Sequence, residues 1–234
     1  LNSNVTASGE VIVGTARTTT STTDIPTAFM NRWSASKQQY IFTKEELNAL
    51  GFNSGLISGL SFELSSLGSA ATNNNYTIKM KSVTNSSFTS TTFVTSDLIT
   101  VYGPVNHTHT ATGWQDIIFT NSYYWDGTSN ILIELTQQGA NSANNAETYY
   151  TSTTDNKGLG DQGSTALTTA TGSYITKRLN TKFIFTGGIS TWSPVTDLYT
   201  DALATQPYVN GHATKVYVKK TLGGDFNYVN NILG

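Results

Sequence analysis

The chain has 234 residues, a formal net charge of -2 and only 12% charged residues. Such a weak, slightly acidic charge excludes a basic surface for the phosphates of a nucleic acid. The absence of cysteine excludes a disulfide scaffold, thiolate metal ligands and a thiol nucleophile. No apolar run is long enough to span a bilayer, so we expect no membrane span.

Neutral polar residues provide most of the solubility, because the chain holds 40 Thr, 24 Ser and 21 Asn residues. Thr favours strands, since its branched Cβ suits a pleated sheet, whereas Ser and Asn favour turns. This composition is common in exported proteins. We expect a mature or excised segment, since no basic-then-apolar signal peptide opens the sequence.

Alternation of apolar and polar residues, the pattern typical of strands, recurs along most of the chain. It predicts strands at residues 9–16, 37–42, 55–66, 76–83, 96–107, 114–119, 130–135, 146–153 and 179–187. We expect 55–66 to pair with 76–83, and 114–119 to form a hairpin with 130–135. The stretch between 155 and 173 reads as a long irregular loop.

The stretch FTKEELNALGF contains the one clear helix signal. Thr43 can cap the N-terminus, Glu46 completes a capping box, and Gly51 can end the helix. A helix of about two turns is not stable alone in water. We therefore expect it to lie over the end of a sheet, with Leu47 and Leu50 turned inward.

Many short strands, regular turn signals and a single short helix predict an all-β fold, an antiparallel β-sandwich of jelly-roll-like type. Loops rather than helices between the strands argue against a parallel α/β sheet. Residues 1–187 would form this sandwich. Residues 188–234, with a Trp-Ser-Pro turn and the strand-like ATKVYVKKT, look like a partial Ig-like domain or a C-terminal extension, because a whole Ig domain needs about 100 residues.

Several stretches resemble a known module in their order along the chain. They are TSTTDIPTAFMNRWSASKQQYIFTKEELNALG, ISGLSFELSS, YTIKMKSVTNSSF, GWQDIIFTNSYYWDGTSNILIEL and RLNTKFIF. Together they resemble a β-sandwich module of large secreted and cell-surface proteins of Bacteroidota, often exported by the type IX secretion system. The tail WSPVTDLYTDALATQPYVNGHATKVYVKKT is similar to the Ig-like repeats that follow such modules in adhesin-like chains.

This resemblance covers roughly residues 18–185 and the tail. It implies an outer-membrane-associated surface protein whose partners are the other domains of a longer chain. It rests on structural residues, so it indicates fold and location rather than activity.

The segment TGWQDIIFTNSYYWDGTSNILIEL contains the first candidate site. Tyr123, Tyr124 and Trp125 are adjacent aromatic residues, and flat rings with a polar edge suit the faces of a sugar. The alternative, which we favour, is structural: Asp126 and Gly127 make a turn, and the flanking aliphatic residues pack into the core. The carboxylates of the segment have no spacing that places a glycosidase pair about 5–10 Å apart.

His107 and His109 fall on one face if their segment is extended. Two histidines at this spacing can hold a transition metal, but a third ligand is normally needed. The sequence offers none nearby. We therefore expect exposed histidines in a loop.

The stretch DNKGLGDQGS is the best metal candidate. Asp155 and Asp161, with an Asn and three glycines, could direct oxygen atoms toward Ca²⁺. The spacing differs from that of an EF-hand loop, and Asp and Gly also make ordinary turns. The interpretations are a structural calcium at Asp155 and Asp161, or a loop without metal and no cofactor.

Enzymatic motifs are missing, because the sequence lacks GxSxG, HExxH, GxxxxGK[ST] and a GxGxxG after a strand. The sequence therefore predicts no enzyme, and the resemblance implies a non-catalytic extracellular, adhesin-like module for adhesion, cell-surface assembly or domain spacing. Its partners would be other domains of the same protein, glycans or neighbouring chains. The alternative is a carbohydrate-binding module that uses the surface aromatics, with calcium in a structural role. A glycan hydrolase built on a jelly roll ranks third.

Overall fold

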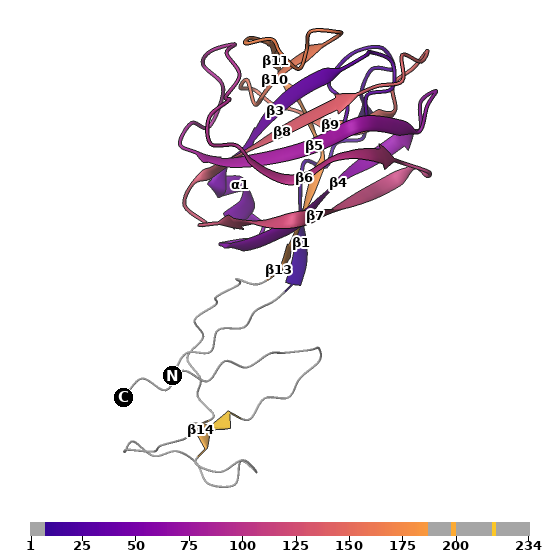
Figure 1. The fold of residues 1–234 in the computed structure, drawn as a ribbon. Helices are drawn as coiled ribbons and strands as arrows, with labels where there is room; N and C mark the ends of the chain where they lie inside the picture. The colour runs from indigo at the N-terminus through magenta and orange to yellow at the C-terminus, as the bar shows by residue number, and fades with distance from the viewer. Residues whose placement is uncertain (1–7, 187–197, 200–216, 219–234) are drawn as a thin grey trace.

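The structure, a computed structural model, describes residues 8–186, 198–199 and 217–218 (Figure 1). Its elements are β1 (Ser8–Val13), β2 (Thr18–Thr19), β3 (Ser36–Phe42), α1 (Lys44–Ala49), β4 (Gly55–Ser66), β5 (Thr72–Val83), β6 (Ile99–Thr108), β7 (Gly113–Trp125), β8 (Asn130–Gln138), β9 (Glu147–Ser152), β10 (Gly158–Gln162), β11 (Ser173–Ile175), β12 (Lys177–Leu179), β13 (Thr181–Thr186), β14 (Leu198–Tyr199) and β15 (Tyr217–Val218). Within these residues, no helix has the length and apolar character needed to cross a membrane.

Eight strands form two facing antiparallel sheets with jelly-roll connectivity. One sheet has the order β1-β13-β4-β7, since β13 and β7 pair with the same stretch of β4 and so lie on its two edges. The other has the order β3-β8-β5-β6. Among these eight strands, the chain crosses to the other sheet from β1 to β3, from β3 to β4, from β4 to β5, from β6 to β7, from β7 to β8 and from β8 to β13. Such repeated crossing is typical of a jelly roll. The predicted all-β, jelly-roll-like sandwich is confirmed.

The pairing of neighbouring strands differs from the prediction. β4 and β5 lie in different sheets, and so do β7 and β8, so neither pair forms a hairpin. Alternation specifies which face of a strand is buried but not which strand lies beside it. The prediction that the apolar residues flanking the Asp126-Gly127 turn pack into the core is confirmed, because one core between the sheets contains Ile117, Phe119, Ile131, Ile133 and Leu135.

Additional strands widen both sheets. β10 and β11 extend the second sheet beyond β3, and β2, β9 and β12 extend the first. The prediction of an irregular loop at residues 155–173 is therefore wrong for β10. Its glycines allow close packing: a Cβ at Gly160 would lie 2.5 Å from the Cδ1 atom of Ile25, so that side chain would have to move.

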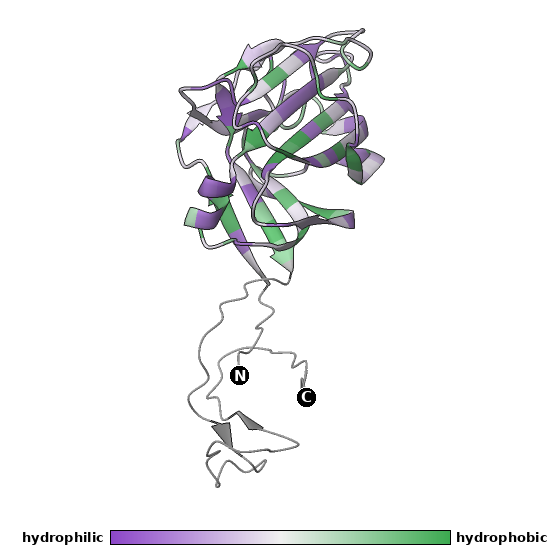
Figure 2. Cartoon of the chain, turned by 90° about the vertical axis from the view of Figure 1, so that its left-hand side faces the viewer, coloured by the Kyte–Doolittle hydropathy of each residue, from purple (hydrophilic) through white to green (hydrophobic). Residues whose placement is uncertain are grey.

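The core between the sheets is filled by large apolar side chains. Figure 2 shows hydrophobic and hydrophilic residues alternating along the strands. Phe52 stacks on Phe185 with ring centroids 4.4 Å apart, and Phe42 meets Phe183 edge-on at 5.0 Å. Such aromatic pairs contribute about 0.5–1.5 kcal/mol each beyond the area they bury.

The helix α1 has the predicted caps. Thr43 and Glu46 form the capping box, and after Gly51 the amide of Phe52 donates to the carbonyl of Leu47, as in a Schellman motif. Leu47 is fully buried as expected. Leu50 is 47% exposed, contrary to the prediction, because it is the C-cap residue and lies beyond the inward face.

Glu46 also links the helix to the sandwich. Its carboxylate accepts two hydrogen bonds from the guanidinium of Arg178, at 2.5 and 2.9 Å. Arg178 in turn donates to the carbonyl of Ile41 and lies over the ring of Phe42. This pairing and the hydrogen bonds from Thr43 outweigh partial burial and lower the pKa of Glu46.

The two ends of the sandwich are neighbours, because Ser8 of β1 pairs with Thr186 of β13. Residues 188–234, expected to form a partial Ig-like domain, lie outside the described residues except for β14 and β15, which pair with each other.

Candidate functional site

The outer face of the six-stranded sheet carries an unusual set of buried side chains. In adjacent strands, Ile41 of β3 lies opposite Leu132 of β8, which lies opposite Lys81 of β5. All three point away from the main core, and both aliphatic residues are at most 2% exposed. Another part of the chain must therefore cover this face.

The cover is the segment between β5 and β6, residues 84–98, which we call the 84–98 loop. Its Phe88 and Phe93 side chains are buried against Ile41, Leu132 and Leu159 in a second hydrophobic cluster. Burying two phenylalanine rings contributes on the order of 3–6 kcal/mol. The loop is thus packed onto the sheet.

Gln39 ties the loop to the sheet with its side-chain amide. Its Nε2 donates to the carbonyl of Val94 at 2.6 Å, and its Oε1 accepts from the amide of Val94 at 3.0 Å. The same Nε2 donates to Glu134 at 2.7 Å. Gln39 is fully buried, so an unpaired amide there would be destabilising.

Main-chain hydrogen bonds fasten the loop at its sides. The amides of Phe88 and Phe93 donate to the carbonyls of Asn156 and Ala170, at 2.8 and 3.0 Å. The side chain of Asn130 donates to two further carbonyls at the start of the loop. A loop held in this way keeps its shape without a ligand.

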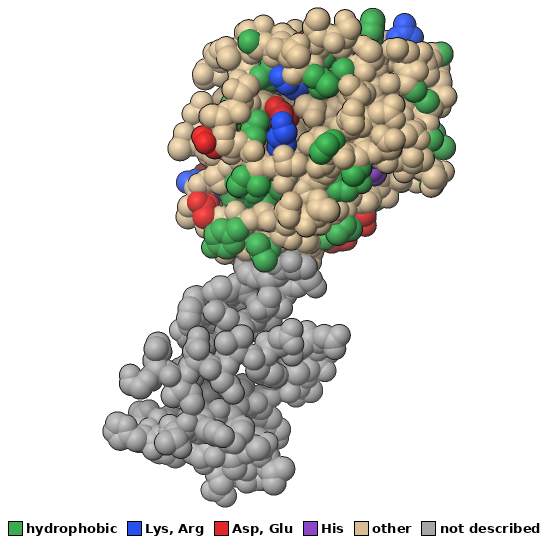
Figure 3. Space-filling model, in the orientation of Figure 1, with side chains coloured by type: hydrophobic (Ala, Val, Ile, Leu, Met, Phe, Trp, Pro, Cys, Tyr) green, Lys and Arg blue, Asp and Glu red, His purple; other side chains and the backbone are tan. Residues whose placement is uncertain are grey.

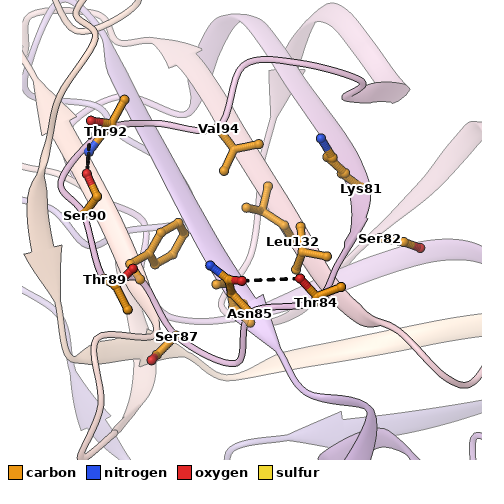
Figure 4. Close-up of a pocket in the computed structure, with 13 residues that line it drawn as sticks. Lys81, Ser82, Thr84, Asn85, Ser87, Thr89, Ser90, Thr92, Val94 and Leu132 are labelled. Carbon is orange, nitrogen blue, oxygen red and sulfur yellow. Dashed lines mark hydrogen bonds between the residues drawn. The ribbon is translucent and has the colours of Figure 1, made fainter.

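Between the loop and β5 lies a pocket of about 380 Å³ (Figure 4). It is lined by Ile41, Lys81, Ser82, Val83, Thr84, Asn85, Ser87, Phe88, Thr89, Ser90, Thr92, Val94 and Leu132. Figure 4 shows Val94 and Leu132 pointing into the middle of the pocket, whereas the hydroxyl of Ser82 points away from it. The pocket combines apolar walls with a polar rim.

Polar atoms on the rim are available to a ligand. Within the described part of the chain, the Asn85 Nδ2, the Ser87 Oγ and the Thr89 Oγ1 have no hydrogen-bond partner, although Asn85 Oδ1 accepts weakly from Thr84 at 3.4 Å. The charged group of the pocket is occupied: Lys81 Nζ contacts Asp97 at 3.3 Å and donates to the carbonyl of Ser96 at 3.0 Å. The free polar groups on this rim are therefore neutral.

A partly buried ion pair lies beside the pocket. Glu134 of β8 is 3% exposed and accepts from Lys79 Nζ at 3.0 Å and from Gln39 at 2.7 Å. Figure 3 shows this face of the molecule as mostly uncharged, with a small group of acidic and basic side chains near its centre. Both oxygens of Glu134 are engaged in holding strands and loop together.

The three aromatic residues predicted as a platform do not lie on one surface. Tyr123 is 6% exposed and Trp125 is fully buried, whereas Tyr124 is 65% exposed. They follow one another in β7, so alternate side chains point to opposite faces. The structure therefore corrects this prediction: only Tyr124 could stack on a ligand.

The structural interpretation of the same segment holds at the turn after Trp125. The carboxylate of Asp126 accepts from the amides of Thr128 and Ser129, both at 2.8 Å. These bonds and that from the Ser129 hydroxyl outweigh slight desolvation and lower the pKa of Asp126 to about 2. Gly127 has φ +75°, and a Cβ there would collide with the carbonyl oxygen of Asn53. This turn carries the chain from one sheet to the other.

His107 and His109 share one face, but they are not the exposed loop residues that the sequence predicted. His107 lies in β6 and stacks on Phe29 with centroids 5.0 Å apart, and His109, 1% exposed, packs on the same ring at 5.0 Å. Burial lowers the pKa of His107 to about 4, with a further contribution from His109. Burial also lowers the pKa of His109, although its hydrogen bond with the carbonyl of Leu67 acts to raise that pKa.

The two carboxylates predicted as calcium ligands lie in different settings. Asp155 precedes β10 and faces Lys157 Nζ at 4.0 Å, whereas Asp161 lies within β10 opposite Lys37. The ammonium of Lys157 beside Asp155 disfavours a cation at that position. In the ranges that the structure describes, no three His, Asp or Glu side chains gather as metal ligands.

The sequence analysis missed the pocket residues, because their stretch, TNSSFTSTTFVTSD, reads as an ordinary polar loop. The available signal was the isolated pair of phenylalanines, Phe88 and Phe93, within it. Two aromatic residues in a polar loop indicate that it packs onto a surface.

Replacing Trp125 by Ala should reduce the free energy of unfolding by about 3–5 kcal/mol, because it removes a buried ring and the hydrogen bond from its Nε1 to Ser129. The matched change Tyr124→Ala should alter it by about 0.5 kcal/mol. Urea unfolding monitored by circular dichroism measures both. Equal losses would contradict the opposite orientations of the two rings.

Acid should destabilise the fold through the histidine pair. Both histidines have a pKa below 6.5 in the folded state, so the unfolded state binds more protons and stability falls as the pH drops from about 6.5 toward 4. For His107 the loss is roughly 1–3 kcal/mol. Urea unfolding at several pH values should show this slope, and His107→Phe, which retains a ring on Phe29, should flatten it. An unchanged slope in that variant would refute the assignment.

Comparison with known proteins gives little further information. No family model matches the sequence, and no curated protein matches it. One similar solved structure is that of the cysteine protease and lectin-like domains of Cwp84, a surface layer associated protein of Clostridium difficile, at 10% identity and a TM-score of 0.40. The match covers 66% of this chain and 33% of that chain, so it spans about a third of the other structure's length.

Proposed function

We propose that the chain is a non-catalytic, adhesin-like binding module of an extracellular or cell-surface protein, and that the pocket under the 84–98 loop is its binding site. The observation that carries this proposal is the contrast between the free neutral groups on the pocket rim and the paired charges beside it. Concave sites with apolar walls and a few polar groups are the usual form of small-ligand sites.

The carboxylates near the site are held in structural roles. Glu134 binds Lys79 and Gln39, and Asp97 binds Lys81. Asp116 lies on the other sheet, where Lys182 contacts it at 2.9 Å. An acid or base catalyst must exchange its proton with a substrate, and carboxylates engaged in ion pairs are poorly suited to that role.

The chain path suits a module within a longer surface protein. The first and last strands of the sandwich pair with each other in the seven-stranded sheet, and the pocket lies on the outer face of the six-stranded sheet. Flanking domains attached beyond Ser8 and Thr186 would thus join the molecule through a different sheet from the one that binds. The proposal includes export by the type IX secretion system of a Bacteroidota species, and the sequence resemblance alone supports this part of it.

Residues 1–234, carrying a fluorescent label, should be retained saturably on at least one of a panel of bacterial cells, extracellular matrix and insoluble polysaccharides, without releasing soluble fragments from it. Retained fluorescence and newly formed reducing ends are measured in the same samples. The absence of saturable retention would contradict the proposal.

Release of fragments over time that is abolished by Glu134→Gln would also contradict it, because a paired structural carboxylate would then be catalytic. Glu45→Gln is the matched control, since Glu45 is an exposed carboxylate of α1.

A further inference from the structure

We infer that the pocket under the 84–98 loop binds one or two uncharged sugar rings of a surface or matrix glycan. This inference rests on the function proposed above and names the ligand class for that site. It uses none of the aromatic residues Tyr123, Tyr124 and Trp125.

The walls and rim of the pocket match the two kinds of surface that a sugar presents. A sugar ring has an apolar face of C–H groups and an edge of hydroxyls, each both donor and acceptor. Val94, which is partly exposed, points into the pocket and provides apolar contact for the C–H face, whereas Leu132 is fully buried (Figure 4). Asn85, Ser87 and Thr89 provide an amide donor and two hydroxyls for the edge.

The charge of the pocket favours a neutral sugar over an acidic one. The ammonium of Lys81 is the one ionisable group among the lining residues, and Asp97 and Ser96 already engage it. A sulfate or carboxylate would have to displace Asp97, whose own negative charge opposes the approach of an anion. A fully apolar ligand is disfavoured as well, since it would leave the rim hydroxyls without partners.

The size of the pocket sets the length of glycan that it can hold. Its 380 Å³ lies near the lower end of the range for small-ligand sites, about 300–1,000 Å³. This leaves room for one or two rings rather than a long chain. A terminal unit or a short branch would therefore be bound.

The loop already has its binding conformation before a sugar binds. Gln39 and the main-chain bonds of Phe88 and Phe93 hold the loop to the sheet, so little ordering is required when a sugar arrives. A preformed site loses less conformational entropy on binding and gains affinity accordingly.

The experiment uses a glycan array containing neutral, sulfated and carboxylated oligosaccharides, followed by titration calorimetry of the hits. The unaltered protein should bind neutral glycans and not their sulfated or carboxylated counterparts. Thr89→Trp, which places a large ring in the pocket, should abolish binding. Asn85→Ala should weaken it about tenfold, because one hydrogen-bond donor is lost.

Thr91→Trp is the matched control, since Thr91 is an exposed threonine of the same loop that does not line the pocket. It should bind like the unaltered protein. Circular dichroism of each variant verifies folding. Binding that persists in Thr89→Trp, or hits confined to anionic glycans, would overturn the inference.

Periodate treatment distinguishes binding of a sugar from the more general binding function on which this inference rests. Periodate cleaves vicinal diols, so treatment of a surface that retains the protein should abolish retention. Retention that survives periodate would overturn the sugar assignment and leave the binding function intact. The absence of retention on every untreated surface would overturn both.

Discussion

The paired hydrogen bonds between the side chain of Gln39 and the main chain of Val94 hold the proposed site together. Without them, the 84–98 loop would keep its two phenylalanine rings and the hydrogen bonds at its sides, but the buried amide of Gln39 would lose its partners on Val94. A buried polar group left unpaired costs about 1–3 kcal/mol, so the loop and the ion pair stabilise each other. The pocket exists because an outer sheet face that would normally be solvated is covered by a fixed loop.

The jelly roll supplies the surface on which this loop lies. Each crossing between sheets directs one side of a strand into the common core and leaves the other side free, so β3, β8 and β5 can carry Gln39, Glu134 and Lys79 in a row across the outer face. On the opposite sheet, Lys182 bridges Asp116 and Glu10 in a similar cross-strand arrangement. The charged groups of these rows thus strengthen the sheets, whereas the uncharged groups of the loop remain free to bind.

Local patterns in the sequence predicted local features well. The capping box of Thr43 and Glu46 and the buried faces of β7 and β8 are present as expected. Pairing between strands was not predictable, because the Asp126-Gly127 turn can close a hairpin or cross between sheets with the same residues. Alternation along the strand predicts that Trp125 and its neighbour Tyr124 point to opposite faces, one buried and one exposed. The aromatic-platform hypothesis grouped these residues and overlooked this difference. The pocket could not be located, since it depends on contacts between residues far apart in the sequence, such as Gln39 and Val94, which are 55 positions apart.

Hydrogen exchange of Gln39→Met, read by mass spectrometry, tests most directly whether the loop is fixed by this contact. The account predicts that peptides covering residues 88–98 exchange at least about tenfold faster than in the unaltered protein, while peptides from β4 and β13 remain protected. Equal protection of the loop in both proteins would contradict the claim that Gln39 holds the pocket in shape.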